Sequence, residues 1–191
     1  LTALVKQGNP RAALEELEQA RARVQTAQAD VRENILSLRT TLAEHSGAIP
    51  ALQEYIQEFG LQTGIDIELD NMVADQVKLS PLAETQLVRI IQEALTNIRK
   101  HARAGKVAVR LATEAGRLTA VVSDDGIGFE PPVDGNHFGL ATMQERAASV
   151  GGELQIDTNP KQGTQITLWL PLMDGNGANL SVEPLSVPAS F

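Results

Sequence analysis

The stretch RLTAVVSDDGIG, residues 117–128, predicts a β-strand that runs directly into an acidic, glycine-rich loop. A second segment, at residues 106–112, predicts the hairpin partner of this strand across a turn around Gly116. Asp124 follows the strand, and the two glycines after it let the backbone turn tightly and let a flat ring approach closely. Taken alone, the segment fits an ordinary β-turn equally well, because Asp-Gly pairs are common in turns.

The rest of the chain predicts helices and antiparallel hairpins around this loop. Residues 49–59, 81–98 and 140–150 predict helices, and residues 65–69, 153–157 and 165–170 predict further strands. Ser80 is expected to cap the second helix with Pro81 in its first turn, and Gly60 is expected to end the first helix. This order of elements predicts an α+β fold, a two-layer α/β sandwich over residues 48–172.

Residues 1–47 are expected to be almost entirely helical and to form a segment of their own. One apolar series within them repeats every seven residues, at Leu17, Val24, Val31 and Leu38. A second series, from Leu14 to Leu42, is interrupted by the polar residues Arg21 and Gln28. A single helix cannot bury such a stripe, so the spacing favours a helical bundle with a partner helix over a plain surface helix.

Each end of the sequence carries a prediction of its own. The first residues, LTALV, start with Leu1 inside an apolar stretch, which indicates that the sequence begins within a longer protein. Residues 173–191 are rich in Gly, Asn, Ser and Pro, and this composition predicts a disordered tail.

Composition and charge argue against several classes of function. The chain has a net charge of -8, with acidic and basic residues mixed along it, and only 3% of its residues are aromatic. These values argue against a nucleic-acid surface or an anionic membrane surface as the main binding partner. The absence of cysteine excludes disulfides, thiol catalysis and Cys-ligated metals, and no apolar run approaches the ~20 residues that a membrane helix needs.

The helix predicted at residues 81–98 carries a polar pair. Glu93 and Asn97 are four residues apart, so both side chains project from the same face of the helix. The amide oxygen of Asn97 is a hard ligand of the kind that Mg²⁺ accepts. Lys100 and His101, one turn further on, could reach phosphate oxygens. On its own, this segment is more typical of a solvated helix face.

Two more segments contain a glycine at the start of a regular element. Gly139 and Leu140 open the last predicted helix, where unpaired N–H groups and the positive end of the helix dipole favour phosphate. The irregular loop before them, residues 129–138, is typical of a mobile lid over a ligand. Thr164, after Gly163, begins the last strand and could hydrogen-bond the base side of a nucleotide cleft.

Together, the four segments resemble the ATP-binding domain of the GHKL superfamily, in which the same sequence motifs occur in the same order. The phrases EALTNIRKHA (93–102), HFGL (137–140) and MQERA (143–147) are similar to sensor histidine kinases of the nitrate- and lipid-sensing branch. The phrase VRENILSLR (31–39) resembles the end of that branch's dimerisation hairpin. The resemblance covers about residues 10–172. It implies a Bergerat-type ATP-binding fold after the C-terminal part of a helical dimerisation and phosphotransfer hairpin at residues 1–47.

The resemblance implies ATP and Mg²⁺ as cofactors. The implied ATP-binding residues are Asn97, Lys100, His101, Asp124, Gly126, Ile127, Gly128, Gly139, Leu140 and Thr164. Among them, Asp124 would hydrogen-bond adenine N6, and Asn97 would also ligate Mg²⁺. Lys100 and His101 would contact the phosphates, and the Gly-Leu pair would close the lid. Glu93 occupies the position of a catalytic carboxylate that assists phosphoryl transfer.

The acceptor histidine expected of this family does not occur in the chain. In the family it lies in a Glu-Leu-His-Asp context on the first hairpin helix, and His45, His101 and His137 all lack that context. We therefore expect the acceptor upstream of Leu1, and we expect these residues to bind ATP without phosphorylating themselves. The expected reaction is transfer of the γ-phosphoryl group to an imidazole nitrogen, in which the protein mainly positions the reactants and neutralises charge.

The resemblance also implies partners and a location. A homodimer through the helical hairpin and a response regulator are expected in the full protein, with no nucleic acid and no direct membrane contact of these residues. The expected location is the cytoplasm, either for a free protein or for the cytoplasmic portion of a membrane-anchored sensor. Two alternatives stay open: a GHKL serine kinase of the anti-sigma type and a non-catalytic nucleotide-binding dimerisation module.

Overall fold

The computed structural model describes residues 47–73, 78–129 and 138–174, all of which belong to one compact unit, Ala43–Phe191. Its elements, in chain order, are α3 (Ala48–Thr63), β1 (Asp66–Asn71), α4 (Pro81–Asn97), the π-helix η1 (Ile98–Ala102), β2 (Lys106–Glu114), β3 (Arg117–Asp124), α5 (Phe138–Ala148), β4 (Glu153–Thr158) and β5 (Thr164–Pro171). The predicted helical stripe, nearly all of the predicted lid and most of the predicted tail lie outside the described residues and stay predictions.

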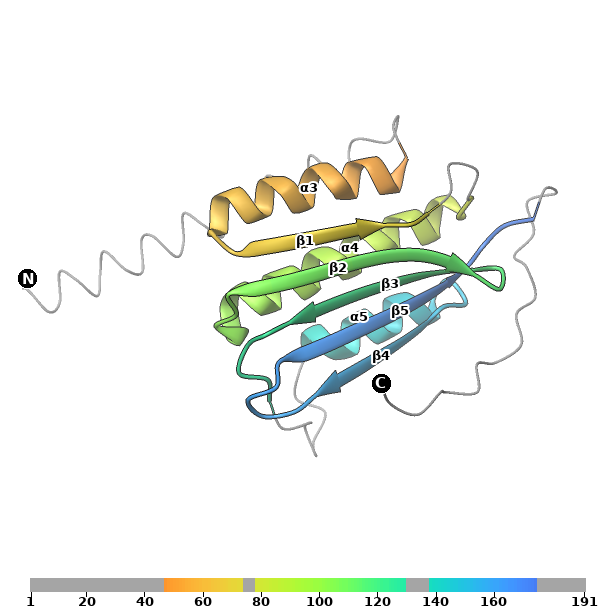
Figure 1. Cartoon of the computed structure of the whole chain (residues 1–191). Helices are drawn as coiled ribbons and strands as arrows, with labels where there is room; N and C mark the ends of the chain where they lie inside the picture. The colour runs from red at the N-terminus through yellow and green to blue at the C-terminus, as the bar shows by residue number, and fades with distance from the viewer. Residues whose placement is uncertain (1–46, 74–77, 130–137, 175–191) are drawn as a thin grey trace, which may run out of the picture. The chain divides into compact units, whose positions relative to one another are not determined.

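The strands of this unit form a single sheet with the order β1-β2-β3-β5-β4. β1 and β2 run parallel, with Asp66 opposite Lys106, whereas the other neighbouring pairs are antiparallel. Figure 1 shows α4 and α5 on one face of the sheet and α3 beside β1. The α+β, two-layer sandwich predicted from the sequence is therefore confirmed.

The core lies between the helices α3, α4 and α5 and the inner face of the sheet. α4 contributes Leu87, Ile91 and Leu95, each at most 1% exposed, because their spacing places them on one face of the helix. The strands contribute alternate residues, among them Leu111 and Leu118, which are fully buried. Burying a side chain of this size stabilises the fold by about 1.5–3 kcal/mol relative to leaving it exposed. This packing holds α4, which carries Glu93 and Asn97, against β3, which ends at Asp124.

The end of α3 differs from the sequence-based expectation. The helix passes through Gly60 and ends at Thr63, because Gly64 takes the left-handed conformation (φ 73°) and donates its N–H to the carbonyl oxygen of Gly60 at 2.9 Å. α4 begins as expected, since Oγ of Ser80 accepts the N–H of Ala83 at 3.2 Å. Within the described residues, none of the helices combines the length and the apolar character that crossing a bilayer requires.

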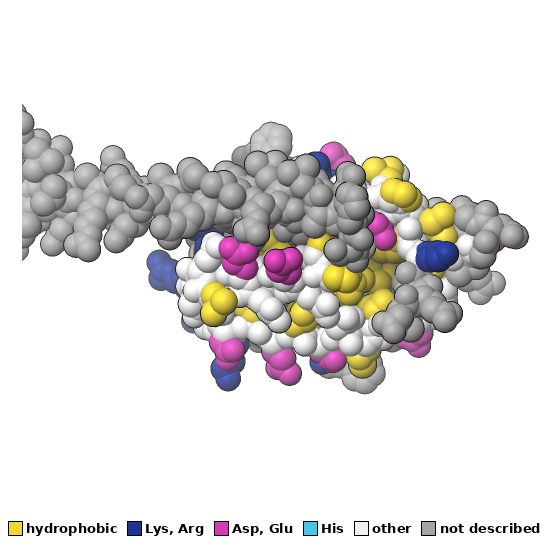
Figure 2. Space-filling model, turned by 90° about the horizontal axis from the view of Figure 1, so that it is seen from above, with side chains coloured by type: hydrophobic (Ala, Val, Ile, Leu, Met, Phe, Trp, Pro, Cys, Tyr) yellow, Lys and Arg dark blue, Asp and Glu magenta, His cyan; other side chains and the backbone are white. Residues whose placement is uncertain are grey.

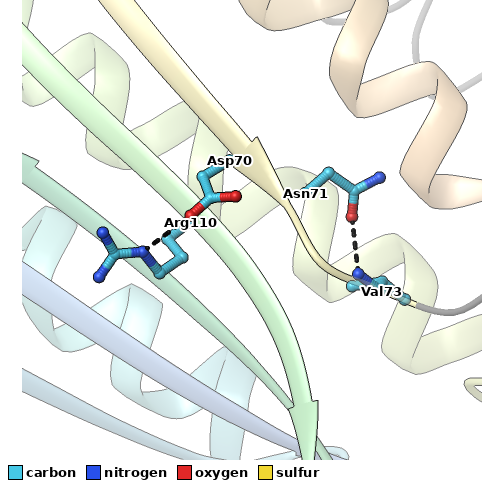
Figure 3. A network of polar contacts seen from close by, with 4 residues as sticks. All are labelled: Asp70, Asn71, Val73 and Arg110. Atoms are coloured by element: carbon cyan, nitrogen blue, oxygen red, sulfur yellow. Dashed lines mark hydrogen bonds and ion pairs between the residues drawn. The ribbon is translucent and has the colours of Figure 1, made fainter.

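The face of the sheet turned away from α4 and α5 carries charged and polar side chains on β1 and β2. Asp70 and Arg110 are register partners, and Nε of Arg110 donates to Oδ2 of Asp70 at 3.2 Å (Figure 3). Where β1 finishes, Oδ1 of Asn71 accepts the N–H of Val73 at 3.1 Å. These contacts join β1 to its parallel neighbour and cap its end.

Exposed apolar side chains lie at both ends of the sheet. Figure 2, viewed from the side of α3, shows apolar side chains gathered toward the end where β1 finishes and α4 begins. Met72 and Leu82, at this end, are 57% and 53% exposed. At the opposite end, Leu61 of α3 is 87% exposed and Ile127, after β3, is 50% exposed. Ile127 belongs to the cavity described next.

Candidate functional site

A cavity of about 550 Å³ opens between α4 and the loop that follows β3. Its lining residues are Glu93, Ala94, Asn97, Ile98, His101, Ala102, Val122, Asp124, Ile127, Gly128, Phe129, Gly139, Leu140, Thr164 and Ile166. They come from α4, η1, the end of β3, the loop that follows β3, the first turn of α5 and the start of β5. The volume is within the range of sites that hold small organic ligands, roughly 300–1,000 Å³.

The polar groups on the helical side of the cavity form one stripe. Glu93, Asn97 and His101 are spaced four residues apart and all line the cavity. At Ile98, α4 widens into η1, a π-helical turn of a kind that often occurs at functional sites. Lys100 is exposed and does not line the cavity, because its side chain leaves the helix in a different direction from that of His101.

Asp124 lines the opposite side of the cavity. Its carboxyl group is half-buried, and its Oδ1 accepts the N–H of Gly126 at 2.8 Å. Burial raises the pKa of Asp124, and the neighbouring charge of Asp125 adds to the rise, whereas the backbone N–H groups of Gly126 and Thr164 oppose it. A carboxylate has more lone pairs than these two donors use, so Asp124 keeps capacity to accept a hydrogen bond from a ligand.

Two glycines allow close backbone approaches behind Asp124. Gly163 has a φ of 76°, and a Cβ atom there would overlap the carbonyl oxygen of Asp124. Gly126 is buried and lies behind the cavity wall, where a Cβ atom would overlap the carbonyl oxygen of Ala102. The same atom would lie 2.7 Å from Oδ1 of Asp124. A residue with a side chain at either position would push the loop away from its neighbour.

Gly139, in the first turn of α5, brings that helix against the polar stripe of α4. A Cβ atom at Gly139 would lie 2.7 Å from Oε1 of Glu93 and 3.6 Å from Nδ2 of Asn97. α5 begins at Phe138, so Gly139 and Leu140 both lie in its first turn, as the sequence predicts. The first N–H groups of a helix have no partner within the helix, and this end of α5 therefore favours an anion.

The turn between β4 and β5 braces the loop after β3, which sequence reasoning missed. The N–H of Lys161 donates to the carbonyl oxygen of Ile127 at 2.6 Å, and the N–H of Phe129 donates to Oγ1 of Thr158 at 3.1 Å. Oγ1 of Thr158 also lies 3.2 Å from Oγ1 of Thr164. Thr158 and Phe129 are 29 residues apart in the chain, so no local pattern indicates their contact.

The apolar walls of the cavity were also absent from the predicted set. They consist of Ala94, Ile98, Ala102, Val122, Phe129 and Ile166. The periodicity of the sequence could have predicted most of these apolar residues. The first three repeat every four residues beside the polar stripe of α4 and η1. Val122 and Ile166 are the neighbours of Asp124 and Thr164 on the same face of their strands.

The structure brings most of the predicted site residues around one cavity. Those that line it are Glu93, Asn97, His101, Asp124, Ile127, Gly128, Gly139, Leu140 and Thr164, whereas Lys100 and Gly126 lie outside its lining. No group of three or more His, Cys, Asp or Glu that could hold a metal ion occurs in the described part of the chain. The amide oxygen of Asn97, which lines the cavity, is a hard ligand of the kind that Mg²⁺ accepts. The binding and catalytic roles of the individual residues stay predictions.

Comparison with known protein families defines the class of protein. Residues 83–174 match the family described as histidine kinase-, DNA gyrase B- and HSP90-like ATPases. This segment runs from α4 to just past β5 and contains every residue that lines the cavity. The domain that these residues form is therefore similar to the ATPase domains of this family.

Curated relatives narrow the class to sensor histidine kinases. The chain is 35% identical over 162 residues to the signal transduction histidine-protein kinase/phosphatase DegS of Brevibacillus brevis, a match that covers 84% of this chain and 42% of DegS. It is 36% identical over 147 residues to the sensor histidine kinase LiaS of Bacillus subtilis strain 168, with 76% and 40% covered. It is also 30% identical over 160 residues to the nitrate/nitrite sensor protein NarX of Escherichia coli K12, with 83% and 26% covered. The predicted resemblance is confirmed, and the chain spans less than half the length of each of these relatives.

A solved structure shares the fold. The histidine kinase domain of the blue-light activated histidine kinase EL346 from Erythrobacter litoralis superimposes with a TM-score of 0.62. The match covers 80% of this chain and 83% of that chain at 19% sequence identity. At this identity, the likeness establishes the architecture alone.

Proposed function

We propose that this chain is the ATP-binding catalytic region of a two-component sensor histidine kinase. It binds Mg·ATP in the cavity beside α4 and transfers the γ-phosphoryl group to an imidazole nitrogen of a dimerisation hairpin. The observation that carries the proposal is that Asn97 and Asp124, from different layers of the fold, line the same cavity. A nucleotide needs groups for its base and for its phosphates within one site.

In this proposal, Asp124 recognises the base. Its half-buried carboxylate accepts the exocyclic amine of adenine while the backbone N–H of Gly126 holds it in place at 2.8 Å. Val122 and Ile166 are 3% and 6% exposed, are register partners on β3 and β5, and line the cavity next to the pair Asp124 and Thr164. An aromatic ring against such apolar side chains gains from burial, whereas its amine gains the hydrogen bond.

Asn97, His101 and the first turn of α5 hold the phosphates. The amide oxygen of Asn97 ligates Mg²⁺, which neutralises phosphate charge when it is bound. Lys100 lies outside the cavity lining, and it reaches the phosphates with its long side chain. Glu93 lies beside the start of α5, and its carboxylate accepts the proton that the attacking imidazole releases as the new nitrogen–phosphorus bond forms and the phosphorus–oxygen bond to the leaving ADP breaks.

Further parts of the proposal concern the full-length protein. We assign residues 1–47 to the dimerisation and phosphotransfer hairpin, residues 48–172 to the catalytic domain and residues 173–191 to a tail. A homodimer forms through the hairpin, and a response regulator receives the phosphoryl group in the cytoplasm. Support comes from relatives whose names describe signal transduction histidine kinases and sensor histidine kinases.

Labelled ATP tests the proposal. The chain is incubated with ATP labelled on its γ-phosphate, alone and together with a separate polypeptide that carries the acceptor hairpin. We expect almost no label on the chain alone and acid-labile label on the added histidine. Acid-stable label on a serine would favour the serine kinase, and a chain that does not bind ATP at all would contradict both readings.

A further inference from the structure

The turn between η1 and β2 directly follows the end of the polar stripe. η1 is a π-helical turn, which is less regular than the α-helix before it. The residue after it, Arg103, takes the left-handed conformation (φ 53°), which a residue with a side chain adopts only under constraint. The turn then reaches β2 through Gly105. Its geometry therefore depends on contacts with the rest of the domain.

Asp125 supplies such contacts from the neighbouring loop. Its Oδ1 accepts the N–H of Gly105 at 2.8 Å and the N–H of Lys106 at 2.9 Å, and its own N–H donates to the carbonyl oxygen of Lys106 at 3.2 Å. The hydrogen bonds from Lys106 and Gly105 hold the pKa of Asp125 below its ordinary value. One carboxylate oxygen thus satisfies two successive backbone donors of the turn.

The two consecutive aspartates hold opposite sides of the site. Asp124 lines the cavity, whereas the exposed Asp125 reaches away from it to the turn that follows η1. A second link reinforces the first, because the N–H of Ile127 donates to the carbonyl oxygen of Ala102, the last residue of η1, at 2.8 Å. The loop that presents Asp124 is therefore tied to the segment that presents His101.

We infer that Asp125 is a positioning residue for nucleotide binding. Its carboxylate anchors the turn at residues 103–106, so that the polar stripe of α4 and η1 keeps its place relative to Asp124. The inference rests on the proposed function and adds a residue that touches neither ATP nor the reacting atoms. Asp125 acts only through the backbone N–H groups of Gly105 and Lys106.

Two substitutions of Asp125 and one control variant distinguish the loss of its hydrogen-bond acceptor from the loss of its negative charge. Asp125→Ala removes the acceptor, whereas Asp125→Asn keeps an oxygen that can accept both N–H groups and removes only the charge. Glu114→Ala removes an exposed negative charge at the far end of β2 and serves as the matched control. Each variant is titrated with Mg·ADP, which occupies both ends of the cavity, and with adenosine, which occupies only the base end.

We expect Asp125→Ala to weaken Mg·ADP binding about tenfold and adenosine binding less than about twofold. Asp125→Asn and Glu114→Ala are expected to bind both ligands like the wild type. Amide proton shifts provide a readout that does not depend on the ligand. In the wild type, the signals of Gly105 and Lys106 should move together on acidification as Asp125 takes up a proton, and in Asp125→Asn this movement should disappear.

Equal losses of adenosine and Mg·ADP affinity in Asp125→Ala would overturn the inference, because the defect would then lie at the base end. Binding by Asp125→Ala that matches Glu114→Ala would overturn it as well. If Asp125→Ala does not fold, the amide signals decide, and a wild type without the shared titration contradicts the inference. A wild type that binds neither ligand contradicts the proposed function itself, whereas normal binding by Asp125→Ala leaves that function standing.

Discussion

The backbone of Gly139, at the start of α5, lies against the carboxylate of Glu93 on α4, since a Cβ atom at Gly139 would come within 2.7 Å of Oε1 of Glu93. The packing of α5 on α4 brings these residues together across a long stretch of sequence. The nearest obstacle is the end of a flexible side chain and not a backbone atom. The contact therefore constrains where the carboxylate points more than it constrains folding.

Gly139→Ala is expected to separate catalysis from stability. Gly139 is helical, so alanine strains no backbone dihedral there, and the free energy of unfolding should change by less than about 1 kcal/mol. The carboxylate of Glu93 must move aside, and we expect the rate of phosphoryl transfer to the separate hairpin to fall at least ~10-fold. Urea unfolding and the transfer assay measure the two effects. An unchanged rate would show that the position of Glu93 does not matter for transfer.

Gly163→Ala is expected to destabilise the fold, because its Cβ atom would overlap the backbone of Asp124. We expect a loss of about 2–4 kcal/mol in the free energy of unfolding. Gly64→Ala is the matched control, since Gly64 has a similar φ of 73° but nothing within 4 Å of its added Cβ atom. The control should lose only about 1–2 kcal/mol, from the left-handed backbone alone. Equal losses in urea unfolding would contradict the close approach of Gly163 to Asp124.

Asp124→Asn should weaken adenine recognition far more than Asp125→Asn does. The amide introduced at position 124 has a single acceptor oxygen, which the N–H of Gly126 and the ligand would then share. We expect affinity for adenosine to fall ~10- to 100-fold, the range of a lost hydrogen bond to a charged group. The amide introduced at position 125 would still accept the N–H groups of the turn. Similar effects of the two substitutions in ligand titrations would show that the segment that recognises the base lies elsewhere.

Adenosine affinity is expected to depend on pH through Asp124. Burial raises the pKa of this carboxyl above its ordinary value, and the ionised form is the stronger acceptor for adenine. Affinity should therefore be full above the raised pKa and should fall as the pH drops through it, at a higher pH than an exposed aspartate would give. Titrations between about pH 7 and about pH 4.5 measure this dependence. Asp124→Asn should show no pH dependence of adenosine affinity. A wild type whose affinity is equally independent of pH would contradict the role of Asp124.

In the protein without ligand, the raised pKa of Asp124 makes the folded state more stable at low pH, which is opposite to its effect on adenosine affinity. Burial disfavours the ionised carboxylate of Asp124, so its contribution to stability is full below the ordinary aspartate pKa and is lost as the pH rises through the folded value. Asp124→Asn should therefore unfold at no lower urea concentration than the wild type at neutral pH. This comparison also shows that weaker adenosine binding by the variant does not come from unfolding.

Asn97→Ala should reduce the stabilisation that Mg²⁺ adds to nucleotide binding. At a hundredfold excess over its dissociation constant, Mg·ATP should stabilise the wild type by ~2.7 kcal/mol, if it binds only the folded state. In Asn97→Ala, the gain measured at the same ligand concentration should fall toward the value found for ATP without Mg²⁺. Asn71→Ala is the control, because Asn71 caps the end of β1 away from the cavity. Full stabilisation of Asn97→Ala in thermal unfolding would exclude Asn97 as a ligand.

Local patterns accounted for most of the elements and for the ends of several of them. Ser80 and Pro81 start α4 as predicted, and the alternation of apolar residues in β3 matches its buried face. The expectation for Gly60 was wrong, because an isolated glycine is tolerated within a helix when its neighbours pack into the core. Lys100 and His101 were expected to act alike, but only His101 lines the cavity.

The sequence by itself determined which polar groups the site contains, since spacing along one helix places Glu93 beside Asn97 and a strand end presents Asp124. Helical and strand periodicity follow from backbone geometry within a few residues, so both can be read without the fold. Only the tertiary structure decided that these groups meet around one cavity, that Thr158 and Lys161 brace its loop, and that Asp125 holds the turn after η1. Those contacts join groups far apart in the chain, and they form because β3 pairs with β2 and β5 and because α4 and α5 pack on the sheet.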